Sequence, residues 1–361
     1  MVPVLWLYGA PGAGKTSTAS ALHARLVADG VEAAYVDVDQ LGMCYPEPPG
    51  DPERHRLKEA NLAGIVAGFE AAGACCVVVS GVVDAATGVH LPNVTGCRLV
   101  VDREEHRRRY VGRGYRVEDV ELALDEADKL ANLPGFSVET SGLTVPEVVD
   151  RVLVVTGWPV TTAAKTRPPE PAVADKPGDV LWLSGATGVG KSTVGFPVFL
   201  RLLGAGQAAG YVDADQLALY AGGGHPLKAR NLATVWRTYH AVGVRTLVVV
   251  GPIEDAAALE QYAVVLPNVR FTLVRLHAGR ATLAERILRR GAGGGSWVQP
   301  GDPLLGRPAE DLKRIAEAAY VDAEALERSR LGHRVDTDGR AVAAIADAVC
   351  EVYARWGSRS G

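Results

Sequence analysis

The stretch VLWLYGAPGAGKTS (residues 4–17) returns as VLWLSGATGVGKST at residues 180–193. In both stretches an apolar run leads into a segment of the form G-x-x-x-x-G-K-[ST], with Lys15 and Lys191 as the lysines. In this motif, called the P-loop, the glycines let successive backbone N–H groups surround a phosphate, and the lysine reaches its outer oxygens. The two stretches therefore predict two nucleotide sites, and the alternative is a pair of glycine turns that bind no nucleotide.

The two loops provide equivalent sets of expected nucleotide ligands. We expect the hydroxyl groups of Thr16 and Ser192 to hold magnesium as well. The complete sets are Gly9, Gly12, Gly14, Lys15, Thr16 and Ser17 in the first loop, and Gly185, Gly188, Gly190, Lys191, Ser192 and Thr193 in the second.

The repetition extends along most of the chain. YVDVDQL (35–41) recurs as YVDADQL (211–217), and HRLKEANL (55–62) recurs as HPLKARNL (225–232). Later matches keep the same order: RYVGRG (109–114) with RILRRG (286–291), and VETSG (138–142) with VDTDG (335–339). This order indicates a duplicated domain. We expect domains at residues 1–156 and 179–361, joined by a proline-rich linker at 157–178.

Composition restricts the class of protein. The chain has 361 residues, a formal net charge of −4 and 48% hydrophobic residues, as in globular proteins. The acidic balance argues against a nucleic-acid partner. The apolar runs are too short for a membrane span and no signal peptide is evident. Five cysteines without a C-x-x-C pair indicate neither disulfides nor a zinc site. We expect a cytoplasmic protein with no membrane partner.

Strand-like apolar runs alternate with helical patterns in each copy. In the first copy the strands are expected at 4–8, 33–38, 75–79, 98–101 and 136–139, with helices between them. Thr144 and Glu147 have the spacing of a capping box at the start of the last helix. Nearly all-apolar strands separated by helices predict a parallel sheet covered on both faces. The fold class is therefore α/β, twice.

Two aspartates follow the second expected strand of each copy. They are Asp37 and Asp39 in the first, and Asp213 and Asp215 in the second. Two residues apart at the carboxyl end of a strand, they project similarly beside the glycine loop. One carboxylate could contact magnesium while the other accepts a hydrogen bond from a substrate hydroxyl, as a general base. The alternative is an Asx pair that caps the loop.

With these motifs, each copy resembles the small P-loop kinases of metabolites, the group that includes shikimate kinase, gluconate kinase and adenylylsulfate kinase. The resemblance implies catalytic roles for both P-loop lysines and both aspartate pairs, with Asp37 and Asp213 at magnesium. It also implies that arginines before a mobile lid face nucleotide phosphates or base. The matching residues are Arg109, Arg113, Arg286 and Arg290. A solvated basic helix face is the alternative.

A repeated pattern, H-x-L-K-x-x-N-L, begins the helix after each aspartate pair, where the same kinases bind their acceptor. Its polar residues could bind an anionic or hydroxylated acceptor, or could simply face solvent at the start of a helix. They are His55, Lys58 and Asn61 in the first copy, and His225, Lys228 and Asn231 in the second.

The copies also differ. The second has a glycine-rich stretch at 291–308 that predicts a longer lid, and Pro197 is expected to disturb the helix after its P-loop. Ser80 in the first copy corresponds to Val250, so a hydroxyl beside the magnesium position favours the first copy as the active one.

The leading hypothesis is an ATP- and Mg²⁺-dependent kinase of a small hydroxylated metabolite, with one or both copies catalytic. The alternatives are a nucleoside, nucleotide or nucleic-acid-end kinase, and a non-catalytic ATP sensor or scaffold. The copies could pack as an intramolecular pseudo-dimer, and an exposed apolar face would imply a homo-oligomer.

Overall fold

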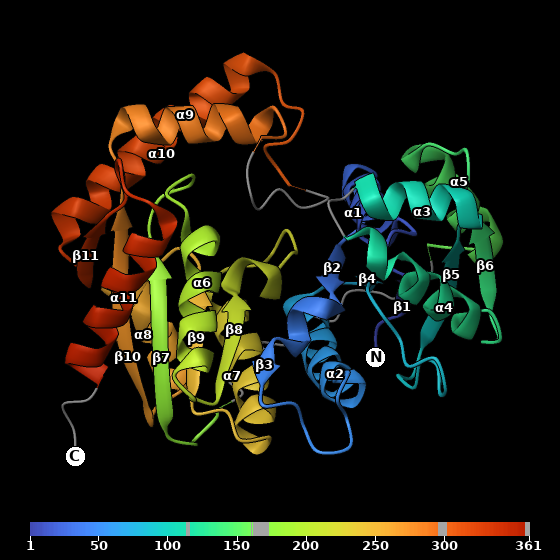
Figure 1. Cartoon of the computed structure of the whole chain (residues 1–361), viewed down its shortest axis with the longest axis horizontal. Helices are drawn as coiled ribbons and strands as arrows, with labels where there is room; N and C mark the ends of the chain where they lie inside the picture. Colours follow the sequence, from blue (N-terminus) through green and yellow to red (C-terminus); the bar gives the residue numbers. More distant parts are fainter. Residues whose placement is uncertain (113–115, 160, 162–172, 295–301, 358–361) are drawn as a thin grey trace. The chain divides into compact units, whose positions relative to one another are not determined.

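The computed structural model describes residues 1–112, 116–159, 161, 173–294 and 302–357 (Figure 1). The chain divides into two compact units. Unit 1 consists of residues 1–42, 53–170 and 218–227, and unit 2 consists of 43–52, 171–217 and 228–361. Each unit thus contains the sheet of one copy together with a short segment from the other copy. No helix in the described parts of the chain is long and apolar enough to cross a membrane.

The sheet of unit 1 is entirely parallel, with strand order β2-β4-β1-β5-β6. Its central strands are buried along their whole length, as expected for strands covered on both faces. The expected strands are present with small shifts at their ends. They are β1 (Val4–Tyr8), β2 (Ala33–Asp37), β4 (Cys76–Ser80), β5 (Val94–Val100) and β6 (Phe136–Glu139).

Helices cover the unit 1 sheet. Helices α1 and α5 pack together, and Leu22 and Val152 from them are fully buried in one core with Leu5 and Leu7 of β1. The capping box at Thr144 is present. The elements are α1 (Lys15–Ala28), η1 (Val38–Gly42), α2 (His55–Ala72), α3 (Arg103–Gly112), η2 (Val117–Asp119), α4 (Val120–Leu130) and α5 (Val145–Thr156).

One expected helix of the first copy is wrong. Residues 81–93, between β4 and β5, are all described and contain no helix; Asp84 and Gly88 instead form an isolated β-bridge. The equivalent connection of the second copy is α8 (Ala256–Val265), where the Asp255 side chain accepts a hydrogen bond from the N–H of Ala258 and caps the helix. The first copy lacks a helix because its connection is shorter and turns at Gly88, whose φ is 72°.

The sheet of unit 2 has strand order β11-β10-β7-β9-β8-β3. All of its pairings are parallel except that of β3, a two-residue segment, which adds antiparallel to β8. The strands are β3 (Cys44–Tyr45), β7 (Gly178–Ser184), β8 (Ala209–Asp213), β9 (Thr246–Val250), β10 (Val269–His277) and β11 (His333–Asp336).

The helices of unit 2 repeat the plan of unit 1, with α6 and α11 packed together. Pro197 lies inside α6, which continues through it from Lys191 to Gly204. Part of the expected long lid, at 295–301, lies outside the described residues. The elements are α6 (Lys191–Gly204), η3 (Ala214–Leu217), α7 (His225–Ala241), α8, α9 (Arg280–Gly291), α10 (Ala309–Ser329) and α11 (Val342–Gly357).

Candidate functional site

Both glycine loops lie between the first strand of their sheet and the following helix. A Cβ atom on Gly9 would lie 2.6 Å from the carbonyl oxygen of Leu99, and one on Gly185 would lie 2.6 Å from that of Leu276. A side chain at either position would therefore force the loop away from the neighbouring strand. Gly14 and Gly190, at the N-caps of α1 and α6, have φ of 94° and 102°. Only glycine adopts this conformation without strain.

The lysine of each loop reaches back across it. The amine of Lys15 donates to the carbonyl oxygens of Gly9 at 2.7 Å and Ala10 at 3.0 Å. Lys191 makes the same pair of bonds in the second loop, at 2.9 and 3.2 Å. The two loops therefore share one internal geometry, in which the amine lies within the ring of backbone that a phosphate would enter.

The first aspartate of each pair contacts the hydroxyl of its P-loop. Thr16 Oγ1 donates to Asp37 Oδ2 at 3.3 Å, and Ser192 Oγ donates to Asp213 Oδ2 at 3.2 Å. The described residues contain no cluster of three His, Cys, Asp or Glu side chains that could hold a metal. A hydroxyl and one carboxylate nevertheless fit Mg²⁺, which usually keeps water and substrate phosphates among its ligands.

Burial shifts the pKa values of several of these groups. It raises the pKa of both Asp37 and Asp213 to about 6, with the neighbouring Asp39 and Asp215 carboxylates acting in the same direction. Burial also lowers the pKa of Lys191, and the nearby aspartates partly offset this change. A cation beside either aspartate would favour its charged form, as expected of a metal position.

The second aspartate of each pair binds a lysine from the next helix. Lys58 Nζ lies 3.4 Å from Asp39 Oδ1, and Lys228 Nζ lies 2.6 Å from Asp215 Oδ1. The aspartates are 41% and 49% exposed, whereas the lysines are mostly covered. In each of these ion pairs the aspartate carboxylate faces solvent beside the P-loop, and the lysine holds a positive charge on its buried side.

The asparagine of the repeated helix pattern has a role that neither sequence hypothesis included. Asn61 is fully buried and donates from Nδ2 to the carbonyl oxygen of Leu41 at 2.8 Å; Asn231 does the same to Leu217 at 2.6 Å. These bonds tie α2 and α7 to the short 3-10 helices that contain Asp39 and Asp215. His55 and His225 are the first residues of α2 and α7.

The lid arginines contact the turn after the last strand. Arg109 Nη1 donates to Thr140 Oγ1 at 2.9 Å, and Arg286 Nη1 donates to Thr337 Oγ1 at 2.9 Å. Arg286 also donates to the carbonyl oxygen of Val189 within its P-loop. Thr140 and Thr337 belong to the repeated segments VETSG and VDTDG. The repetition of these segments was therefore the sequence feature that could have indicated the contact.

The other two lid arginines are Arg113 in the first copy and Arg290 in the second, and only Arg290 lies among the described residues. Arg290 pairs with Asp302, whose side chain is 1% exposed, and Arg290 is near enough to Lys191 to contribute to the lowering of its pKa. Arg113 lies outside the described residues.

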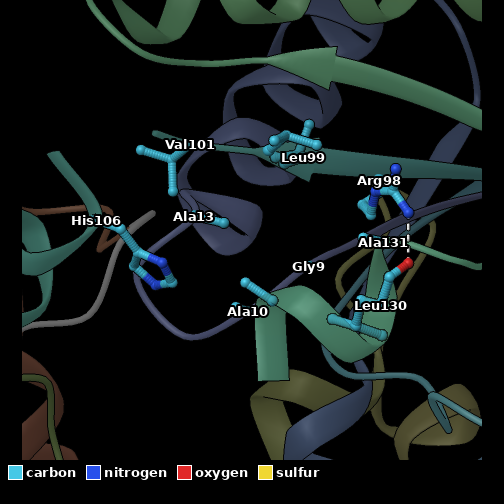
Figure 2. Close-up of a pocket in the computed structure, with 11 residues that line it drawn as sticks. Gly9, Ala10, Ala13, Arg98, Leu99, Val101, His106, Leu130 and Ala131 are labelled. Carbon is cyan, nitrogen blue, oxygen red and sulfur yellow. Dashed lines mark hydrogen bonds between the residues drawn. The ribbon is translucent and has the colours of Figure 1, made fainter. Parts of the chain in front are cut away.

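A small cavity lies beside the first P-loop (Figure 2). Its volume is about 70 Å³, and its lining includes Ala10 and Ala13 of the loop and Leu130 of α4. His106 of α3 also lines it, fully buried, and its Nε2 donates to the carbonyl oxygen of Pro11 at 2.6 Å. Its Nδ1 has no partner among the described residues. Sequence reasoning missed His106, because Leu283 occupies the corresponding position of the second copy.

Two further polar side chains, those of Ser80 and Glu126, lie near the first P-loop. Ser80 is beside Asp37 in the pairing of β4 with β2, and its hydroxyl is 2.8 Å from that of Tyr35. Glu126 of α4 has a raised pKa through burial, which nearby Lys15 partly opposes. No repeated motif marks Glu126, so sequence comparison of the copies gave no signal for it.

No protein-family model matches the chain. Several solved structures are similar to about half of it. A gluconokinase from Sinorhizobium meliloti is 17% identical over 50% of this chain and 94% of its own, with a TM-score of 0.33. Shikimate kinase from Acinetobacter baumannii, in complex with shikimate, is 14% identical over 52% of this chain and 97% of its own, with a TM-score of 0.33.

An APS kinase from Mycobacterium tuberculosis, in complex with AMPPNP and APS, is also similar. It is 20% identical over 50% of this chain and 99% of its own, with a TM-score of 0.30.

Proposed function

We propose that the chain is an ATP-dependent phosphotransferase that moves the γ-phosphoryl group of Mg-ATP to a hydroxyl of a small metabolite. The observation that carries the proposal is a constellation found twice. In each copy a P-loop lysine, a P-loop hydroxyl bonded to an aspartate, and a second aspartate paired with a lysine lie together. A phosphate-binding loop beside a solvent-facing carboxylate suits phosphoryl transfer to an alcohol.

Different residues of each site bind the phosphates and the magnesium. When bound, Mg-ATP supplies the transferable phosphoryl group and neutralises charge on it. The P-loop amides hold the phosphates, and Lys15 or Lys191 exchanges its two carbonyl partners for phosphate oxygens. Thr16 with Asp37, or Ser192 with Asp213, would hold the magnesium. Catalysis then rests on positioning and on electrostatic stabilisation.

The second aspartate handles the acceptor in this proposal. Asp39 or Asp215 accepts a hydrogen bond from the acceptor hydroxyl and can take its proton. The lysine beside each carboxylate, Lys58 or Lys228, fixes the direction of that carboxylate. Because Asn61 is already bonded inside the fold, we assign it to positioning rather than to the acceptor itself.

The proposed working unit is a pair of kinase-like domains, residues 1–156 and 179–361, joined by the linker at 157–178. We place it in the cytoplasm, because all five cysteines are free thiols and reducing compartments preserve such thiols. The formal net charge of −4 favours a small-molecule acceptor over a nucleic acid.

The test is ADP formation from Mg-ATP with a panel of sugars, sugar acids, cyclitols, hydroxy acids, nucleosides and oligonucleotides. Wild type is compared with Lys15→Met and Lys191→Met, which remove the amine and keep the length of the side chain. Lys129→Met and Lys313→Met are matched controls on exposed lysines. We expect one compound class to stimulate turnover, and a P-loop variant but neither control to remove most of that activity.

The other outcomes are distinct. Stimulation by nucleosides or oligonucleotides alone would redirect the proposal to that acceptor class. Tight ATP binding without acceptor-stimulated ADP would indicate a nucleotide sensor. If both P-loop variants retained wild-type turnover and nucleotide affinity, the site assignment would be wrong.

A further inference from the structure

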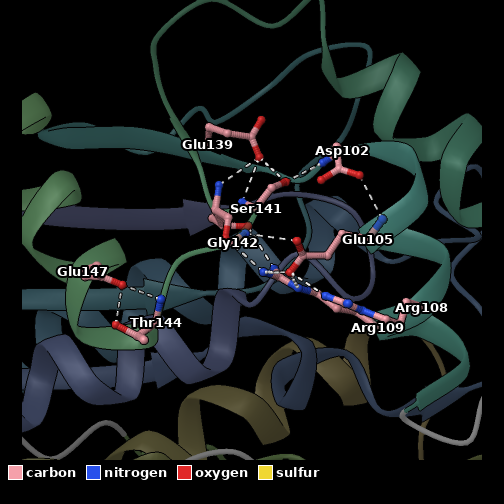
Figure 3. A network of polar contacts seen from close by, with 10 residues as sticks. Asp102, Glu105, Arg108, Arg109, Glu139, Ser141, Gly142, Thr144 and Glu147 are labelled. Carbon is pink, nitrogen blue, oxygen red and sulfur yellow. Dashed lines mark hydrogen bonds and ion pairs between the residues drawn. The ribbon is translucent and has the colours of Figure 1, made fainter.

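The lid arginine of unit 1 is bound to a carboxylate. Glu105 Oε1 accepts a hydrogen bond from Arg109 Nε at 2.8 Å, and its Oε2 accepts one from the backbone N–H of Gly142 at 3.0 Å (Figure 3). Arg108 lies 3.5 Å from the same carboxylate. One acidic side chain therefore joins α3 to the turn after β6 and occupies the donors of both.

The second copy has the same donors without this acid. Arg286 corresponds to Arg109, but the position equivalent to Glu105 is Thr282. Within the described residues Arg286 bonds only to neutral oxygens, those of Val189 and Thr337, and forms no ion pair. The turn N–H of Gly339, equivalent to Gly142, has no acceptor in the same described part of the chain.

We propose that Glu105 acts as an internal anion that weakens nucleotide binding at the first P-loop, which makes the second P-loop the tighter nucleotide site. This inference rests on the proposed function and adds a difference between the two sites to it. In the first copy Glu105 accepts hydrogen bonds from Arg109 and from the Gly142 N–H, so these donors are not available to a bound phosphate. In the second copy Thr282 has no carboxylate to accept from the equivalent donors.

Electrostatics supports this role. The Gly142 amide and Arg109 together lower the pKa of Glu105, so the group is ionised at neutral pH. A nucleotide phosphate approaching Arg109 meets a guanidinium whose charge is already balanced, and it must also approach a carboxylate. A phosphate near Arg286 meets a guanidinium that forms no ion pair with the described residues; Asp338, in the same turn, accepts a hydrogen bond from the backbone N–H of Gly279 instead. The negative charges of Glu105 and of the phosphate repel each other, even in a partly exposed site.

The experiment isolates each site and exchanges the two residues. Lys191→Met leaves the first site for measurement, and Lys15→Met leaves the second. Affinity for a non-hydrolysable ATP analogue with Mg²⁺ is measured by calorimetry. In the Lys191→Met background, Glu105→Thr should tighten binding by about tenfold, the effect of one partly screened charge. In the Lys15→Met background, Thr282→Glu should weaken binding by about the same factor.

Two controls separate this effect from simpler causes. Glu104→Thr removes the same charge from an exposed neighbour on α3, and it should change affinity by less than about twofold, because exposed charges are screened. Glu105→Gln keeps the side-chain shape and should reproduce most of the tightening if charge is the cause. Circular dichroism confirms that each variant is folded.

The inference is overturned if folded Glu105→Thr and Thr282→Glu both bind like their parents. The proposed function would survive that result, since each P-loop lysine would still be required at its own site. If neither site of the wild type bound nucleotide, the proposed function itself would fail first.

Discussion

Thr16 and Asp37 are separated by 21 residues in sequence and are joined by a hydrogen bond of 3.3 Å between hydroxyl and carboxylate. Asp37 ends β2, whereas Thr16 lies in the first turn of α1, which follows β1, and β4 lies between β2 and β1 in the sheet. The parallel register places Asp37 beside Ser80, and Ser80 beside Leu7, at the carboxyl ends of three strands. A start-of-helix hydroxyl and an end-of-strand carboxylate thereby become neighbours.

Asp37→Asn and Asp213→Asn should weaken the response to magnesium. Each removes the charged oxygen beside a P-loop hydroxyl while keeping the size of the side chain. The affinity of that site for ADP with Mg²⁺ should fall at least about tenfold, whereas affinity without Mg²⁺ should change little. Titration calorimetry with and without the metal measures both. Asp29→Asn, at an exposed aspartate, is the matched control; equal losses with and without metal would contradict this role.

Asp37 should make folding stability depend on pH. Its pKa is about 6 in the folded protein against an ordinary value of 3.8, so between these values the folded state binds more protons than the unfolded chain. Stability therefore falls as pH rises through this window, by up to about 3 kcal/mol at 1.36 kcal/mol per pKa unit. In urea unfolding with EDTA, Asp37→Asn should be more stable than wild type at pH 7.5. The gap should close near pH 4; a constant gap would refute the linkage.

Asn61→Ala should destabilise unit 1. It removes a buried hydrogen bond to Leu41 and leaves that carbonyl without this donor, which costs about 1–3 kcal/mol. Because the bond holds the turn that follows Asp39, the variant should also raise the KM for the acceptor more than it lowers kcat. Urea unfolding and steady-state kinetics measure the two effects. Ala60→Ser, on the exposed side of α2, should stay within about 0.5 kcal/mol of wild type.

Ala13→Val should stabilise unit 1 by about 0.5–1 kcal/mol, because the added methyl groups enter the cavity beside the first P-loop. Val189 occupies the equivalent position of the second loop and is buried. Val189→Ala should destabilise unit 2 by about 1–3 kcal/mol through lost burial and the space left behind. Thermal unfolding of both variants tests the pair. A loss of stability in Ala13→Val would show that the cavity cannot admit the larger side chain.

The fold and the conformation of the glycine loops were predictable because their signals are local. An apolar strand, a glycine loop and a helix occupy consecutive residues, and the duplication supplied a second example of each. The aspartate pairs were predictable for the same reason, since they directly follow a strand. The capping box at Thr144 is another local pattern, fixed by residues three apart.

The rest depends on contacts between distant residues. Nothing in the spacing of Asn61 indicates that its amide reaches the carbonyl oxygen of Leu41, because that contact depends on how α2 packs against the preceding turn. Glu105 and His106 were missed because they belong to one copy only, and comparison of the copies draws attention to what they share. The missing helix at 81–93 reflects a shorter connection, in which a glycine turn replaces a capped helix.

The resting position of the P-loop lysines links occupancy of the site to the stability of the fold. Lys191 has a lowered pKa because folding takes its amine out of water, and two carbonyl oxygens are only partial replacements for that hydration. A polyanion would offer this amine a full counter-charge. Ligand-free protein is therefore held below its attainable stability, and saturation with nucleotide should protect the chain from heat and proteolysis more than the ligand's contact area alone suggests.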